Sequence, residues 1–471
     1  MARLILDFDS KKPLYKQIVE YYQNAIFNGY LIPGTLLPTE RELATQLEVN
    51  RSTITTAYAE LRANGLISSK QGSGTRVSEE AEELLPNHSI TWNKLRNHHL
   101  NEDSLVFKQV YQYMNDPSFI NLMTGTAAPD LCLAKETREL IPYTIRSNSA
   151  VSVPYSVSRS LCSLINEEAD PRNMVLTSSI EQAILISLKC LLTPGDTIAV
   201  EAPSNFAHIN MLLTSGIKVI WFSIDNPLTE QLMRKEKLKL VITSPLYNQC
   251  YNKPSTIKKR KDLLQLCEQA TIPIVEIIEA PLLIHSKINS IPTYYELARD
   301  RKFVIQIGHF TGIAPGISVG WILGPPNVKL RLQEVQMQLG LIPPPVLLEL
   351  IDNILSSEII FEHLDIVMIE LRERRNLLLS MIESSLKEIE VVERDDPTSL
   401  WLDIKTLATD KEIVKVFLEE HLLLLPYVGI NNTIRIKIPL FYVDKEPLLS
   451  GVQRLISSMN KIEQRELVQV Q

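Results

Sequence analysis

The 471-residue sequence predicts two folded parts: a small N-terminal domain of helices and a β-hairpin, and a large α/β domain with a smaller α+β lobe. Two observations carry this prediction. Capped helical segments and a glycine-rich hairpin occupy residues 13–77, and buried strand patterns alternate with helical patterns from residue 119. The polar residues between these parts lack clear periodicity. We therefore divide the chain into domain 1–78, linker 79–118, large domain 119–345 and small lobe 346–471.

The composition is that of a globular protein. Hydrophobic residues make up 45% and charged residues 22%, and the formal net charge is −7. This charge argues against a protein that binds nucleic acid over its whole surface, but it permits one local DNA-binding domain. The apolar stretches are too short for a signal peptide or a membrane span, and the cysteines show no paired spacing. We expect a cytoplasmic protein with buried thiols, no membrane contact and no metal site.

The N-terminal domain is predicted to begin with three helices. Residues 13–29 carry apolar side chains at helical spacing and end at a glycine. Thr39 and Glu42 form a capping box for a second, short helix, and Asn50 is the N-cap of a third. The buried face of the third helix would consist of Ile54, Ala57, Tyr58 and Leu61.

The second and third helices predict a DNA-binding function. Two short helices joined by a tight turn, the second with a polar and basic start, are the geometry of a helix-turn-helix reader. The strands expected at 66–70 and 75–77 add a wing. Between Val49 and Val77, four basic residues (Arg51, Arg62, Lys70 and Arg76) against one acidic residue (Glu60) give a local charge of +3. Local positive charge is what phosphate binding requires, so we expect double-stranded DNA as a partner.

The domain resembles the winged-helix domain of the GntR family of regulators over residues 13–77. The matching segments are PLYKQI, IPGTLLPTERELATQLEVNRSTITTAYAELRANGLI and QGSGTRV. The resemblance implies a sequence-specific transcriptional regulator that binds an operator. Thr55 departs from it, because some relatives carry arginine there. By the resemblance, the DNA contacts are Arg41, Arg51, Ser52, Thr53, Gln71 and Gly72.

Buried strands separated by helices predict a parallel or mixed α/β sheet in the large domain. A helix is expected at 181–191, long helical stretches follow Pro345, and strands recur in the small lobe at 399–404 and 433–438. The strands expected in the large domain are 174–177, 197–200, 218–222, 238–243, 273–278, 303–307 and 320–323.

This order of elements resembles fold-type I aminotransferases, and the fusion resembles the MocR subgroup of GntR regulators. The matching segments include Leu192–Thr197, Glu201-Ala202-Pro203, Thr243-Ser244-Pro245, an expected turn at Gly308-His309-Phe310, and Ala314-Pro315-Gly316. In such enzymes a lysine Schiff base, a carboxylate on the pyridine nitrogen and a phosphate cup hold pyridoxal phosphate. The resemblance also implies a homodimer, because aminotransferase clefts form between subunits.

The residues at those chemical positions depart from the family. No lysine occurs in Phe310–Gly316, and Ile277 stands where the carboxylate is expected. Ile180 and Glu181 place an apolar side chain and a negative charge at the helix start that would bind phosphate. Ser318 replaces a phosphate-binding arginine. We therefore expect no cofactor, no enzyme activity, and an aminotransferase-like domain that serves dimerisation and the binding of an effector.

Two alternatives stay open. In one, the comparison misplaces the lysine, Lys302 is the nearest candidate, and the chain is a regulator or enzyme that binds pyridoxal phosphate. In the other, side chains fill the old pocket and the domain only dimerises.

Three residues are candidates for binding a small-molecule effector. Arg435 matches the family's arginine for a substrate carboxylate, although an ion pair within the fold explains it equally well. Asn248 lies in the turn after a buried strand. Tyr155 lines the former cleft or, as is more common for an aromatic residue, packs in the core.

Overall fold

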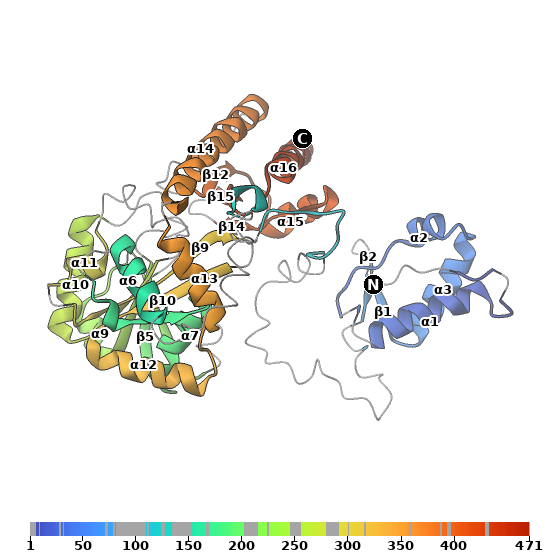
Figure 1. The fold of residues 1–471 in the computed structure, drawn as a ribbon. Coiled ribbons are helices and arrows are strands. Elements are labelled where there is room, and N and C mark those ends of the chain that lie inside the picture. Colours follow the sequence, from blue (N-terminus) through green and yellow to red (C-terminus); the bar gives the residue numbers. More distant parts are fainter. Residues whose placement is uncertain are drawn as a thin grey trace. The chain divides into compact units, whose positions relative to one another are not determined.

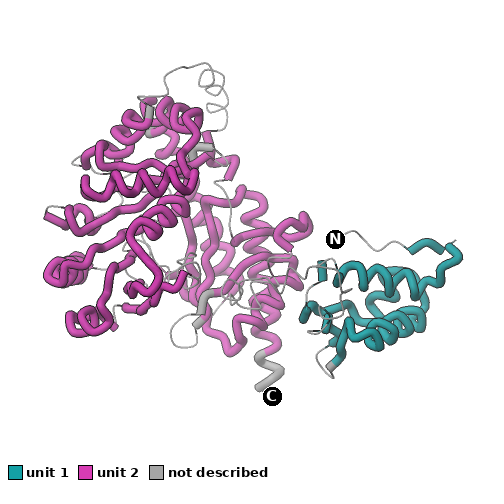
Figure 2. The backbone as a smooth tube through the Cα atoms, turned by 90° about the horizontal axis from the view of Figure 1, so that it is seen from below, with its two compact units in different colours: residues 1–97 teal, residues 98–471 magenta. Residues whose placement is uncertain are grey.

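The computed structural model consists of two compact units, residues 1–97 and residues 98–471, shown in teal and magenta in Figure 2. Each unit has a hydrophobic core of its own. The structure describes residues 6–8, 10–27, 30–31, 33–70, 74–78, 81, 110, 113–123, 128–133, 153–165, 169–201, 215–223, 226–244, 256–278, 292–299, 301–314, 317–357, 359–386, 389–392, 397–428 and 433–470.

The described part of the N-terminal unit consists of three helices and a hairpin (Figure 1). The predicted N-caps are confirmed. The hydroxyl of Thr39 accepts a hydrogen bond from the N–H of Glu42 at 3.3 Å, and the Glu42 carboxylate accepts one from the N–H of Thr39 at 2.8 Å. Asn50 Oδ1 accepts from the N–H of Ser52 at 2.9 Å. The elements are α1 (Leu14–Phe27), α2 (Glu40–Gln46), α3 (Arg51–Ala63), β1 (Ile67–Lys70) and β2 (Gly74–Val77).

The apolar faces of α1 and α3 meet in the core of this unit. Ile18 and Ile54 are completely buried, and each such side chain stabilises the fold by about 1.5–3 kcal/mol. Tyr22 and Tyr58 pack edge to face, with ring centroids 6.0 Å apart. The Tyr58 hydroxyl donates a hydrogen bond to the carbonyl of Pro38 at 2.8 Å. These contacts hold α3 against α1 and against the start of α2, so the polar side of α3 faces outward.

The large unit contains a seven-stranded sheet in the order β4-β10-β9-β8-β7-β5-β6. β10 is antiparallel to both of its neighbours, and the pairs β9-β8, β8-β7, β7-β5 and β5-β6 are parallel. The predicted mixed α/β sheet is therefore confirmed. Its strands are β4 (Met174–Thr177), β5 (Thr197–Glu201), β6 (Lys218–Phe222), β7 (Leu238–Thr243), β8 (Ile274–Ile278), β9 (Val304–Ala314) and β10 (Ile317–Leu323).

Helices cover both faces of this sheet. α7 (Ile180–Leu191) and α12 (Pro326–Gln338) pack on one face, where they share an apolar cluster with alternate strand residues. The other face packs against α6 (Val153–Ile165), α9 (Glu230–Lys235), α10 (Ile257–Ala270), α11 (Tyr294–Leu297) and α13 (Pro345–Leu355).

The prediction of a turn at Gly308-His309-Phe310 is wrong. These residues lie inside β9, where Gly308 pairs with Trp321 of β10 and Phe310 pairs with Val319. A Cβ on Gly308 would lie 2.4 Å from Cζ2 of Trp321. The glycine therefore marks the close approach of an indole ring from the neighbouring strand, and not a turn.

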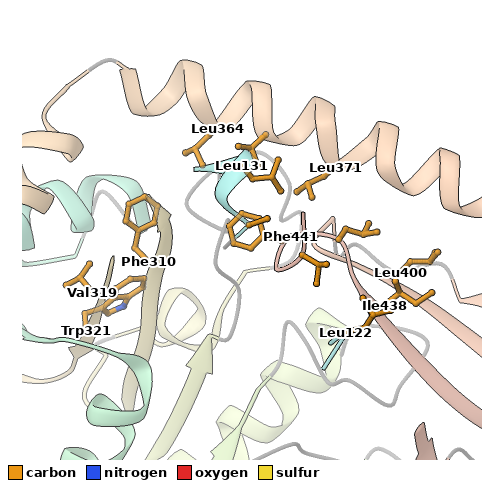
Figure 3. Packing of buried hydrophobic residues seen from close by; sticks show 14 of the residues in the cluster. Leu122, Leu131, Phe310, Val319, Trp321, Leu364, Leu371, Leu400, Ile438 and Phe441 are labelled. Carbon is orange, nitrogen blue, oxygen red and sulfur yellow. The ribbon is translucent and has the colours of Figure 1, made fainter. Parts of the chain in front are cut away.

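The small lobe is built on an antiparallel sheet in the order β11-β12-β15-β14. Its strands are β11 (Ile389–Val392), β12 (Ser399–Lys405), β14 (Pro426–Val428) and β15 (Thr433–Pro439), and its helices are α14 (Ile359–Ser385), α15 (Asp410–Glu419) and α16 (Lys445–Val470). Figure 3 shows Leu364 and Leu371 of α14 above Leu131, which lies in the short 3-10 helix η4 (Pro129–Leu131), and above Phe441.

The residues that follow the linker join the small lobe. β3 (Ile120–Asn121) pairs in parallel with β13 (Leu422–Leu423). Arg454 of α16 donates to the carbonyls of Ser118 at 3.2 Å and His421 at 2.7 Å. The boundary at residue 119 would place this strand with the large sheet. A two-residue strand has no periodicity of its own, so its partner cannot be read from the sequence.

We expect Gly320→Ala to destabilise the large unit. A Cβ there would lie 2.4 Å from Thr177 Oγ1 and 2.5 Å from the carbonyl oxygen of Ser179. Such overpacking costs about 1–3 kcal/mol, measurable as a lower urea midpoint of the full chain. Gly324→Ala is the control, because its Cβ would meet only the Ile305 side chain, at 3.3 Å, which is a much smaller overlap. Equal losses in the two variants would contradict the prediction.

Candidate nucleic-acid interface and aminotransferase-like site

The starts of α2 and α3 carry four of the predicted DNA contacts. Arg41 lies in the first turn of α2, and Arg51, Ser52 and Thr53 are the first three residues of α3. Arg41, Arg51 and Ser52 are exposed, and Thr53 is half-buried. Glu40 Oε2 lies 3.8 Å from Arg51 Nε, so the starts of the two helices are adjacent. The exposed start of α3 is the part of a recognition helix that reaches base edges.

Several basic groups of this unit are already engaged by protein atoms. Arg76 Nη1 donates to the carbonyl of Gly34 at 2.9 Å, and Arg62 Nε donates to the hydroxyl of Ser69 at 3.1 Å. The Arg51 side chain is 69% exposed, and its contact with Glu40 is longer, at 3.8 Å. Arg51 is therefore well placed to meet a phosphate or a base. The predicted contacts Gln71 and Gly72 lie outside the described residues.

In the large unit, apolar packing occupies two positions at which the family resemblance implies polar contacts. Ile180 at the start of α7 and Ile277 on β8 are buried in the same cluster, between the sheet and helices α7 and α12. Ser318 of β10 donates a hydrogen bond to the carbonyl of Ser178 at 2.9 Å. The residues between β4 and α7 are thus held closely against β10.

The first turn of α7 satisfies hydrogen-bonding groups from within the protein. The N–H of Gln182 donates to the hydroxyl of Ser179 at 3.3 Å, and the N–H of Ser178 donates to Gln182 Oε1 at 3.1 Å. Glu181 adds a carboxylate to the same turn. An anion bound there would compete with these acceptors and meet a negative charge.

The far half of β9, where the resemblance implies a lysine, is largely apolar. Phe310 is buried, and desolvation lowers the pKa of the neighbouring His309 to about 4, so its imidazole is neutral at physiological pH. Lys302 is exposed and precedes Val304, the first residue of β9. It therefore lies at the opposite end of the strand from residues 310–314.

The candidate effector residues have different environments. Arg435 on β15 is buried, and its Nε and Nη2 each lie 2.6 Å from a carboxylate oxygen of Asp403 on β12. This geometry agrees with the ion-pair interpretation. Tyr155 on α6 is 54% exposed, so the expectation that it packs in the core is wrong; Val157 of the same helix is buried instead. Asn248 lies outside the described residues.

A buried row of polar side chains crosses the large sheet and was not predicted from the sequence. Thr243, Glu276 and Gln306 are register neighbours on β7, β8 and β9, and the Thr243 hydroxyl is bound to the carboxylate of Glu201 at the end of β5. Gln306 Nε2 donates to Glu276 at 3.2 Å. The only local signal for this row is a charged residue inside an apolar strand, Ile-Val-Glu-Ile-Ile.

Burial and hydrogen bonding act in opposite directions on Glu276. Desolvation raises the pKa of this carboxyl to about 7, although it accepts hydrogen bonds from the N–H groups of Tyr294 at 2.8 Å and Tyr295 at 3.2 Å. The buried guanidinium of Arg260 offsets part of this shift.

Within the described ranges, no three His, Cys, Asp or Glu side chains are arranged to hold a metal ion. In the same part of the chain, no helix has the length and apolar character needed to cross a membrane.

Comparison with known families divides the chain in the same way. Residues 14–77 match "Bacterial regulatory proteins, gntR family", and residues 133–441 match "Aminotransferase class I and II". The protein is therefore of the class in which a GntR-type helix-turn-helix precedes a fold-type I aminotransferase fold, as in MocR-type regulators. Since the second match covers more than half of its length, the chain belongs to the aminotransferase class I and II family.

Similar proteins include both regulators and enzymes. An uncharacterized HTH-type transcriptional regulator of Bacillus subtilis, YdfD, is 27% identical, and the match covers 80% of this chain and 82% of that protein. The HTH-type transcriptional regulator NorG of Staphylococcus aureus is 25% identical, over 75% of this chain and 82% of NorG. The 2-aminoadipate transaminase of Thermus thermophilus is 22% identical, over 74% of this chain and 92% of that enzyme.

Solved structures agree on the fold of the large unit. The α-aminoadipate aminotransferase LysN of Thermus thermophilus, complexed with N-(5'-phosphopyridoxyl)-L-leucine, has a TM-score of 0.65 at 19% identity, covering 79% of this chain and 99% of that one. The multiple substrate aminotransferase of Thermococcus profundus also has a TM-score of 0.65 at 19% identity, covering 80% of this chain and 100% of its own.

We expect Arg51→Ala to weaken binding of the full chain to a DNA duplex selected from a random library by the parent protein. Loss of a base contact costs about 1–3 kcal/mol, whereas loss of a phosphate contact lowers the salt slope of binding by about 1. Fluorescence anisotropy over a range of KCl concentrations separates these outcomes. Lys258→Ala removes an exposed positive charge from α10 and is the control. Unchanged binding by the Arg51 variant would remove this residue from the interface.

We expect Glu276 to make the large unit less stable as the pH rises. The pKa of the Glu276 carboxyl is about 7 in the folded chain, above the usual 4.5. The stability that the protonated carboxyl contributes is therefore complete below pH 4.5 and is lost as the pH rises through about 7. Glu276→Gln mimics the protonated form and should remove that part of the pH dependence, on the order of 3 kcal/mol at most. The difference in urea midpoint between parent and variant, measured over this range, is the test. If the difference in urea midpoint does not change with pH, the pKa of Glu276 is not raised in the folded chain.

Proposed function

We propose that this protein is a cytoplasmic, sequence-specific transcriptional regulator whose aminotransferase-like domain carries out no pyridoxal phosphate chemistry. In this proposal the domain instead dimerises the chain and binds an effector. The observation that carries the proposal is the apolar cluster that contains both Ile180 and Ile277. These are the positions at which the family resemblance implies a phosphate cup and a carboxylate.

The residues present do not fit pyridoxal phosphate. Ile277 is 2% exposed and offers no carboxylate to keep a pyridine nitrogen protonated. The start of α7 has Glu181 where a phosphate dianion would need positive potential, and Ser318 donates to a protein carbonyl. The segment Phe310–Gly316 contains no lysine. Covalent attachment, the electron sink and the anion site would thus all be lost together.

The regulatory half of the proposal is supported by the GntR-type domain and by the similarity to YdfD and NorG, whose names describe HTH-type transcriptional regulators. A single recognition helix reads only a few base pairs, and helix-turn-helix proteins usually bind two half-sites as dimers. A homodimer formed through the aminotransferase-like unit would supply the second recognition helix.

The purified full chain, mixed with pyridoxal phosphate, tests the loss of cofactor chemistry. We expect no visible absorption band that survives dialysis and no lysine labelled after borohydride reduction. The 2-aminoadipate transaminase of Thermus thermophilus, treated identically, is the positive control for the procedure. A retained band with a labelled lysine would overturn the proposal, and its loss in Lys302→Ala would identify that residue as the attachment site.

A further inference from the structure

Glu40, the first residue of α2, is in contact with one side of the recognition helix. The Thr55 hydroxyl donates to Glu40 Oε2 at 2.8 Å, and Arg51 Nε lies 3.8 Å from the same oxygen. Arg62 Nη2 lies 3.6 Å from the other oxygen, Oε1. Residues 51, 55 and 62 are four and seven positions apart, so they share the face of α3 that is directed at α2.

Arg62 extends these contacts to the hairpin. Its Nε donates to the Ser69 hydroxyl on β1 at 3.1 Å, and Ser69 Oγ lies 2.9 Å from Thr75 Oγ1 on β2. Ser69 and Thr75 are paired across the two strands that flank residues 71–73. A continuous series of polar contacts therefore runs from the hairpin through Arg62 and Glu40 to Arg51.

We propose that Glu40 is a positioning residue that holds Arg51 and the hairpin in a fixed relation, so that recognition helix and wing meet DNA as one preorganised surface. The proposal rests on the DNA-binding function and adds a determinant of its specificity. It also accounts for Thr55, where some relatives carry arginine. A hydroxyl at this position donates to Glu40 without adding a second cation that would compete with Arg51.

The charge of Glu40 contributes to discrimination as well. Its side chain is 22% exposed, next to the surface that would meet phosphates, and its negative charge therefore opposes binding to any DNA. Only a duplex that uses the aligned Arg51 and wing gains from the contacts that Glu40 makes. Attraction to the correct sequence and repulsion from the others thus act in the same direction.

Glu42 provides a matched control in the same helix. It caps α2 through Thr39, and glutamine keeps the capping-box pattern. Glu40→Gln and Glu42→Gln each remove one negative charge from the first turn of α2. A difference between the two variants therefore reports the contacts of Glu40, and not the net charge or the helix dipole.

The experiment compares the full-length parent and both variants on two duplexes, one selected by the parent from a random library and one of scrambled sequence. For Glu40→Gln we expect the ratio of specific to scrambled affinity to fall about three- to tenfold, with scrambled binding unchanged or stronger. For Glu42→Gln we expect the parent's ratio. Arg62→Gln should reproduce the Glu40 effect, and the double variant should lose less than the two single losses combined. Melting temperatures of all variants check that they fold.

An unchanged or increased ratio in Glu40→Gln overturns the proposal, because it would mean that Glu40 is neutral or competes with DNA for Arg51. If the losses of specificity in the two single variants add up in the double variant, Glu40 and Arg62 do not act through each other, which contradicts the proposal. If the parent itself enriches no sequence from the library, the DNA-reading function fails, and the positioning role fails with it.

Discussion

The close packing of β10 between β4 and β9 is the constraint on which the aminotransferase-like site depends. Glycines permit it on both sides: Gly308 accommodates the ring of Trp321, and Gly320 lies against Thr177 and the carbonyl of Ser179. Because the chain turns from β4 into α7 at this point, the same packing sets where the first turn of α7 can lie. The hydrogen bond from Ser318 to the Ser178 carbonyl follows from that closeness.

With the backbone constrained in this way, the side chains decide what the site can do. Polar groups near the family's ligand positions are engaged by the protein itself: Arg435 with Asp403, Ser318 with Ser178, and the N–H of Gln182 with Ser179. Pairing within the protein satisfies the hydrogen-bonding capacity of these buried polar groups without a bound ligand. The stability of the fold comes from the apolar clusters on the two faces of the sheet, and so does not depend on a ligand at these polar groups.

Local signals were sufficient for much of the fold. The N-caps Thr39 and Asn50, the strands of the large sheet and the long helices after Pro345 each follow from residues that are neighbours in sequence. Interactions between distant segments were not predictable in this way. Asp403 is 32 residues from Arg435, and the partners of Glu276 come from β9 and α11. Gly308 was misread because a glycine beside an aromatic ring and a glycine in a turn look alike in sequence.

The residues that come directly after the linker are bound to the small lobe of the large unit. β3 pairs with β13, and Asp130 is bound to Arg374 of α14, whose Nη1 also donates to the carbonyls of Leu440 at 3.1 Å and Val443 at 2.9 Å. Arg374 is 1% exposed and also pairs with Glu370 at 3.1 Å, so separating Asp130 from it would remove one of the two carboxylate partners of a buried charge. The described residues just after the linker therefore pair and hydrogen-bond with the small lobe, and not with the strands of the seven-stranded sheet.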